Sequence, residues 1–207
     1  MSERAVRGLY LVTPDEADSA DLLAAVARVL PARPALLQYR NKLADAAQRR
    51  DEALALAVLC REAGVRFVVN DDLALALAVG ADGVHLGRDD GDPAAARAAL
   101  GPGRLLGVSC YGEWARAERG AAAGADYLAF GAMFVSPTKP QAVRAPRELL
   151  GRARRELDRA VAAIGGITLD NAGEVIEAGA DLVAVISDVF AAPDPLARAL
   201  AYRRLFD

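Results

Sequence analysis

Short apolar runs recur along this chain, and they alternate with longer segments rich in alanine and leucine. Three of the runs follow the tripeptide Gly-Ala-Asp, which begins at Gly80, Gly124 and Gly179, and a weaker copy begins at Gly64. Glycine suits the end of a helix because the residue after the last turn usually needs a positive φ. An apolar run of four or five residues without alternation is typical of a strand buried on both faces of a parallel sheet. Each repeat therefore predicts a helix, a tight turn and a buried strand.

The same pattern extends to eight strand–helix units. The predicted strands are Leu9–Val12, Ala35–Tyr39, Phe67–Val69, Gly83–Leu86, Leu105–Val108, Tyr127–Phe130, Val161–Ile164 and Leu182–Ile186. The predicted helices are Asp21–Leu30, Leu43–Ala63, Leu73–Val79, Pro93–Leu100, Glu113–Ala123, Pro146–Leu157, Leu169–Ala178 and Pro195–Leu205. This alternation indicates parallel strands joined by right-handed crossovers, and eight units in about 200 residues favour an α/β fold closed into a (β/α)₈ TIM barrel.

An open doubly wound sheet is the alternative, because alternation alone does not show closure. Two features count against it. The first strand is followed by Thr13-Pro14-Asp15 instead of a glycine-rich dinucleotide fingerprint, and polar residues stand at nearly every strand end instead of one switch point. No linker divides residues 1–207, so we expect a single barrel domain. The longest irregular segment, Gly131–Ala145, has the length of a functional lid.

Composition narrows the class of protein. With 54% hydrophobic residues the chain can bury a core, and a net charge of −3 gives no basic field for nucleic acid. Cys60 and Cys110 lie far apart without metal-type spacing, so a reducing cytoplasm is the simplest setting. Neither a signal peptide nor a membrane-length apolar stretch is expected. Small-molecule substrates are the expected partners, and a homo-oligomer stays open.

In barrels of this kind the chemistry lies at the carboxyl ends of the strands. After the second strand, Gln38, Arg40 and Lys42 alternate and therefore share a face in extended geometry. Two cations and an amide on one face suit a polyanion such as diphosphate. The alternative is a solvated helix N-terminus, which is less favourable because cations there oppose the helix dipole.

Carboxylates follow the next two strands. Asp71 and Asp72 come after the third strand, and Asp89 and Asp90 after the fourth. Neighbouring strands lie about 4.8 Å apart, so one carboxylate from each could share a cation. Hard oxygen ligands without a Cys or His pair indicate Mg²⁺ rather than Zn²⁺. Each aspartate is also a common helix cap, and the sequence does not separate the two roles.

The fourth to sixth strands carry weaker signals. His85, the single histidine, lies within a strand and is interpreted as a packed barrel-wall residue instead of a base. Ser109 can donate a hydrogen bond to phosphate, but no base is evident beside it, so we expect no hydrolase triad. Cys110 is interpreted as a small filler residue. The segment Ser136-Pro137-Thr138-Lys139-Pro140 forms either a stiff anion-binding loop or an ordinary turn.

Glycine and serine follow the last two strands. Gly165-Gly166-Ile167 ends the seventh strand unit, and Ser187 follows Ile186 at the end of the eighth. Loops after strands seven and eight form the usual phosphate site of this fold. The sequence therefore predicts two anion sites in one barrel mouth, as expected for an enzyme that joins a diphosphate ester to a phosphate-bearing molecule.

Together these residues give the chain a resemblance to the thiamine phosphate synthase family over essentially its whole length. The matching stretches are Gln38–Lys42, Val69–Asp71, Gly83–Gly87 with Asp90, Gly107–Ser109, Thr138-Lys139, Ile164–Ile167 and Val185–Ser187. The resemblance implies a transferase that couples 4-amino-2-methyl-5-(diphosphooxymethyl)pyrimidine with 4-methyl-5-(2-phosphoethyl)thiazole, or with its carboxylated tautomer. In that reaction diphosphate leaves first, and the thiazole nitrogen then attacks the pyrimidinylmethyl cation.

The resemblance also implies roles for single residues. The pyrimidine diphosphate would be held by Gln38, Tyr39, Arg40, Asn41, Lys42, Asn70, Ser109 and Lys139, of which Arg40, Lys42, Ser109 and Lys139 would be catalytic. The thiazole phosphate would be held by Ser136, Pro137, Thr138, Gly166, Ile186 and Ser187. Mg²⁺ would be held by Asp71 and Asp90.

Four positions depart from the family pattern. Arg88 stands where glutamine is usual, Val135 replaces a proline and Ser136 replaces a threonine. Asp188 follows Ser187, and a carboxylate there is unfavourable for phosphate binding unless it points away. Neither a metal ligand nor a principal cation is lost.

Three other functions compete. A thiazole tautomerase would need neither the aspartate pair nor the Gln-x-Arg-x-Lys run. A non-catalytic phosphate-ligand binding protein would have no use for paired carboxylates. A phosphosugar isomerase or aldolase would usually show a lysine within a strand or a carboxylate base, and neither is found in this sequence.

Overall fold

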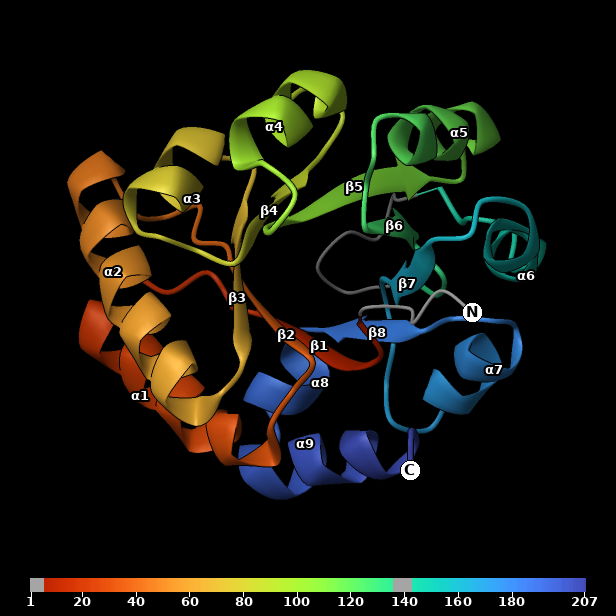
Figure 1. The fold of residues 1–207 in the computed structure, drawn as a ribbon. Coiled ribbons are helices and arrows are strands. Elements are labelled where there is room, and N and C mark those ends of the chain that lie inside the picture. The colour runs from red at the N-terminus through yellow and green to blue at the C-terminus, as the bar shows by residue number, and fades with distance from the viewer. Residues whose placement is uncertain (1–5, 136–142) are drawn as a thin grey trace.

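A closed barrel of eight parallel strands forms the centre of the molecule, as the repeat predicted (Figure 1). The computed structural model describes residues 6–135 and 143–207. Each strand pairs with the next in the chain, and the last pairs with the first, so the predicted closure is confirmed. The strands are β1 (Gly8–Val12), β2 (Leu36–Tyr39), β3 (Arg66–Asn70), β4 (Gly83–Leu86), β5 (Leu105–Tyr111), β6 (Tyr127–Phe130), β7 (Ala160–Ile164) and β8 (Leu182–Val185).

Helices surround the barrel on its outside (Figure 1). They are α1 (Ser19–Val29), the 3₁₀ turn η1 (Leu30–Ala32), α2 (Ala46–Ala63), α3 (Leu73–Ala78), α4 (Pro93–Leu100), α5 (Trp114–Ala122), α6 (Glu148–Glu156), α7 (Ala172–Glu177), α8 (Ser187–Phe190) and α9 (Pro195–Arg204). The predicted start of α2 at Leu43 was three residues early, because Asp45 caps the helix. Arg40 and Lys42 therefore lie in the loop before α2. Among the described residues, none of the helices has the length and apolar character that a membrane crossing requires.

The Gly-Ala-Asp repeat has a structural role at the amino ends of the strands. The Asp82 carboxylate, just before β4, accepts the backbone N–H of Phe67 in β3 at 2.7 Å. The equivalent contacts are those of Asp126 with Leu106 N at 2.7 Å and of Asp181 with Val161 N at 3.0 Å. Each aspartate thus joins its own strand to the preceding one, at the barrel end opposite the chemistry.

Side chains fill the barrel interior, so the lumen is a packed core and not a channel. Apolar groups such as Val12, Leu36 and Val68 are buried there together with two tyrosines, Tyr10 and Tyr127. The hydroxyl groups of the two tyrosines are hydrogen-bonded to each other at 2.8 Å.

Candidate active site

Side chains at the end of β2 and just after it point alternately to opposite sides, as the sequence pattern predicted. Gln38 points into the barrel, and its Nε2 donates to the Tyr10 hydroxyl at 2.5 Å. The Arg40 guanidinium binds both carboxylate oxygens of Asp15 at 2.9 Å. The backbone N–H of Lys42 donates to the same carboxylate at 2.8 Å. Burial raises the pKa of Asp15, but these hydrogen bonds and the two cations together lower it by more, so Asp15 stays ionised and fixes this loop.

Tyr39 and Asn41 turn the other way. The Tyr39 hydroxyl donates to Glu52 in α2 at 2.7 Å, and Asn41 Nδ2 donates to Glu52 at 3.0 Å and to the Glu16 carbonyl at 2.7 Å. Both side chains are buried. These side chains join β2 to the outer layer, because strand alternation directs them away from the lumen. The expectation that Tyr39 and Asn41 hold the pyrimidine diphosphate stays a prediction.

Asp71 and Asp90 lie in contact, with a hydrogen bond between their carboxyl groups. Burial, and next the neighbouring Asp90, raise the pKa of Asp71 to about 6, while Asn70 and Lys42 oppose the shift. Asp90 also accepts the backbone N–H of Gly87 at 2.8 Å. Two touching carboxylates destabilise each other as anions, and a divalent cation between them would remove that repulsion.

The other two candidate carboxylates are excluded from this contact. Asp72 caps α3 by accepting the N–H of Leu75 at 2.8 Å, and Asp89 is exposed. Of the four aspartates, Asp71 and Asp90 are thus the two that lie together, and their role as metal ligands stays a prediction. The residues described here include no cluster of three or more metal-ligating side chains, so a cation at Asp71 and Asp90 would take its remaining ligands from substrate oxygens and water.

Ser109 lies at the end of β5 beside the single histidine. His85 Nε2 is 2.8 Å from Ser109 Oγ, and His85 Nδ1 is 3.1 Å from the Tyr127 hydroxyl. The sequence showed no partner for Ser109, and the structure brings His85 beside it. The prediction of a buried barrel-wall histidine is confirmed. No hydrolase triad results, because the third group is a phenol and not a carboxylate.

Gly165 and Gly166 follow β7 with positive φ angles of 98° and 65°. A Cβ at Gly166 would lie 2.4 Å from the carbonyl oxygen of Val135, so a side chain there would displace the strand-six loop. Asn171 Nδ2 donates to the Gly166 carbonyl at 3.1 Å. Glycine at this position thus lets two loops of the barrel mouth approach each other closely.

The short helix α8 starts at Ser187, with Ile186 as the preceding residue. The neighbouring Asp188 is bound by Arg198 at 3.0 Å and by the Tyr202 hydroxyl at 2.7 Å, both in α9. Its carboxylate is therefore held by the outer layer, which answers the concern that it would repel a phosphate. Another departure, Arg88, pairs with Glu113 and lies over the Tyr111 ring. The predicted contacts Ser136, Pro137, Thr138 and Lys139 lie outside the described residues.

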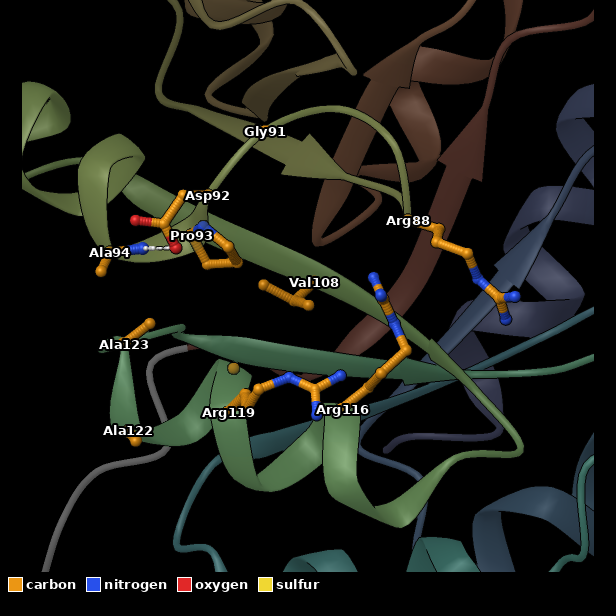
Figure 2. Close-up of a pocket in the computed structure, with 11 residues that line it drawn as sticks. Arg88, Gly91, Asp92, Pro93, Ala94, Val108, Arg116, Arg119, Ala122 and Ala123 are labelled. Atoms are coloured by element: carbon orange, nitrogen blue, oxygen red, sulfur yellow. Dashed lines mark hydrogen bonds between the residues drawn. The ribbon is translucent and has the colours of Figure 1, made fainter.

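A cavity of about 410 Å³ lies on the outside of the barrel between α4 and α5. Figure 2 shows Arg116 and Arg119 on α5 at its wall, facing the loop that carries Arg88. Arg116 donates to the carbonyl of Ser109 at 3.1 Å and to that of Gly87 at 3.3 Å. This cavity is separate from the barrel mouth. Its Arg116 nevertheless joins the ends of β4 and β5 from the outside of the barrel.

Comparison with known proteins decides the family. The family model described as thiamine monophosphate synthase matches residues 9–189. This chain belongs to that family. The thiamine-phosphate synthase of Azoarcus sp. (strain BH72) is 74% identical over 206 residues and all of both chains, and that of Aromatoleum aromaticum (strain DSM 19018 / LMG 30748 / EbN1) is 67% identical over 207 residues, again all of both. Among solved structures, the thiamine phosphate pyrophosphorylase from Pyrococcus furiosus has a TM-score of 0.86 and 32% identity, covering 98% of this chain and 96% of that one.

Membership of the thiamine monophosphate synthase family makes the chain an enzyme of thiamine phosphate synthesis, acting on small molecules. The family resemblance inferred from the strand ends is thereby confirmed. The sequence reasoning missed two features of the site: the Asp15 clamp on Arg40 and the contact between His85 and Ser109. Neither contact has a local sequence signal, because each joins residues that lie far apart in the sequence.

Proposed function

We propose that this enzyme couples the pyrimidine diphosphate with the thiazole phosphate, forms thiamine phosphate and releases diphosphate. The observation that carries the proposal is the division of the barrel mouth. Cationic and paired acidic side chains stand at the ends of β2 to β4, and a glycine–serine half stands at the ends of β7 and β8. Such a mouth suits one diphosphate and one phosphate held side by side.

The first half stabilises the departing diphosphate. Arg40 and Lys42 carry positive charge to it, and Asp71 with Asp90 would hold Mg²⁺, which when bound supplies further neutralising charge. The touching carboxylates fit a divalent cation, since they are unfavourable neighbours without one. Lys139, which the family resemblance also assigns to this half, would add a third cation.

The second half orients the thiazole. Backbone N–H groups around Gly166 and Ser187 suit its phosphate, because glycine allows the close approach of main chain and anion. Ser136, Pro137, Thr138 and Ile186 complete this half in the proposal. Once diphosphate has left, the held thiazole nitrogen needs only to be in line with the cationic carbon, so positioning replaces acid–base chemistry.

The direct test is a reaction with purified protein. Mixing the pyrimidine diphosphate, the thiazole phosphate and Mg²⁺ should give thiamine phosphate and diphosphate in equal amounts, detected by chromatography. Leaving out the thiazole phosphate should give no thiamine phosphate. The absence of product from the complete mixture would contradict the proposal. Conversion of one thiazole tautomer into the other without coupling would instead assign the tautomerase reaction.

A further inference from the structure

Five polar side chains form one continuous hydrogen-bonded chain through the barrel interior. It runs from Gln38 to Tyr10 at 2.5 Å, to Tyr127 at 2.8 Å, to His85 at 3.1 Å and to Ser109 at 2.8 Å. The first four side chains are at most 6% exposed, and Ser109 is half-buried at the mouth. The chain therefore runs through the buried interior from β2 to β5, two strands that carry candidate diphosphate ligands.

The barrel holds this chain rigidly. The rings of Tyr10 and Tyr127 meet edge to face at 5.6 Å, and His85 stacks on Tyr127 at 5.5 Å. Gly107 makes room for the second tyrosine, since a Cβ there would lie 2.1 Å from Cζ of Tyr127. No other residue fits at that position without moving the phenol, so the sequence of β5 is matched to the path of the chain.

The direction of the chain follows from its first member. The amide nitrogen of Gln38 can only donate, so the Tyr10 oxygen accepts from it. In the arrangement that leaves no buried phenol proton without a partner, Tyr10 donates its single proton to Tyr127. Tyr127 then donates to Nδ1 of His85, which leaves the imidazole proton on Nε2, pointing at Ser109 Oγ. All three groups are buried, and in this arrangement each of them holds one proton.

We propose that this chain makes Ser109 a fixed hydrogen-bond donor towards the substrate anion, and that His85, Tyr127 and Tyr10 are positioning residues. The proposal rests on the proposed function for the identity of that anion, the diphosphate. Because the Ser109 oxygen already accepts from His85, its own proton is directed elsewhere, to the mouth. The same arrangement prevents His85 from acting as a base on Ser109, since the nitrogen facing the serine carries a proton.

The first test reads the proton on the histidine directly. His85 is the only histidine of the chain, so uniformly ¹⁵N-labelled protein gives one pair of imidazole nitrogen signals. We expect a protonated Nε2 and an unprotonated Nδ1 between about pH 6 and 8. Tyr127→Phe should shift the Nδ1 signal, because it loses its donor, whereas Tyr202→Phe, an equally buried tyrosine of α9, should leave both signals unchanged. A proton on Nδ1, or on both nitrogens, would overturn the proposal.

The second test asks whether Tyr127 acts through Ser109. Tyr127→Phe should lower kcat by about tenfold, with KM for the thiazole phosphate changed less than twofold, and should have no further effect in a Ser109→Ala background. Equal losses in the two backgrounds would contradict the positioning role. His85→Gln, whose amide can donate to Ser109, should retain more kcat than His85→Leu. If the wild-type protein makes no thiamine phosphate, the proposed function fails, and the NMR signals still decide the direction of the chain.

Discussion

At the scale of single residues, the strongest electrostatic feature of the mouth is the contact of Asp71 with Asp90. Burial and the neighbouring carboxylate raise the pKa of Asp71 to about 6, so without a cation the pair takes up a proton as the pH falls towards 6. A bound metal needs both carboxylates ionised and therefore competes with that proton. Mg²⁺ binding at this pair should accordingly depend on pH.

We expect titration with Mg²⁺ alone, followed by calorimetry, to show an apparent affinity that falls about tenfold from pH 7 to pH 5, because the proton occupies the site below a pKa of about 6. Asp71→Asn should abolish the binding. Asp89→Asn is the matched control, since Asp89 lies in the same loop as Asp90 but is exposed, and it should bind as the wild type does. Binding that survives Asp71→Asn would remove Asp71 from the metal site.

The features of single residues that the sequence did not predict are those that depend on contacts between distant parts of the chain. Alternation predicted that Gln38, Arg40 and Lys42 share a face, but not that Asp15 from the preceding loop would bind the Arg40 guanidinium. Asp71 and Asp72 are adjacent, and only the backbone separates their roles: Asp71 has a φ of 64°, and Asp72 has the extended geometry of a helix cap. Sequence spacing carries no information on such a choice.

At the scale of elements, the Gly-Ala-Asp turns bind neighbouring strands at the amino end of the barrel. Asp126 accepts the N–H of Leu106 at 2.7 Å and pairs with Arg97 at 2.5 Å. Asp126→Ala should lower the free energy of unfolding by about 1–3 kcal/mol, because a strand N–H loses its acceptor. Urea unfolding measures this change, while kcat should stay within twofold, since this end of the barrel lies away from the chemistry.

The control for that variant is Asp51→Ala on the exposed face of α2, which should change the free energy of unfolding by less than about 0.5 kcal/mol. An Asp126→Ala protein as stable as this control would contradict the structural role of the repeat. A large loss of kcat at full stability would instead connect the amino end of the barrel to the reaction.

Apolar runs predicted every strand of the described barrel. Parallel strands that are buried on both faces appear in the sequence as continuous apolar runs, without alternating polar residues. Two helical pieces were missed, η1 and α8, because three or four residues are too few to show a helical period. The strand β5 also runs past its predicted end at Val108 to Tyr111, and its pairing with β6 is irregular between Ser109 and Tyr111. That irregularity lies where Ser109 enters the mouth.

At the scale of the whole molecule, closure of the barrel brings the diphosphate half and the phosphate half to one mouth. The pairing of β8 with β1 leaves a single strand between the glycine–serine loops after β7 and β8 and the cations after β2. The sequence predicted both halves from their residue types. Whether the two halves lie close together depends on closure of the barrel. The alternation of strands and helices in the sequence favoured closure but did not require it. The two halves come from separate elements, so they should be separable by mutation.

Gly166→Ala tests this separation. The new Cβ would lie 2.4 Å from the Val135 carbonyl oxygen, and alanine would have to adopt the positive φ of 65° that glycine has here. The loops of the phosphate half must therefore move apart. We expect kcat/KM for the thiazole phosphate to fall about tenfold or more, with Mg²⁺ binding unchanged within twofold. Gly173→Ala in α7, where a Cβ meets nothing within 4 Å, is the matched control and should keep full kcat/KM with equal or higher stability. An equal loss of Mg²⁺ binding in Gly166→Ala would mean that the two halves form one cooperative site.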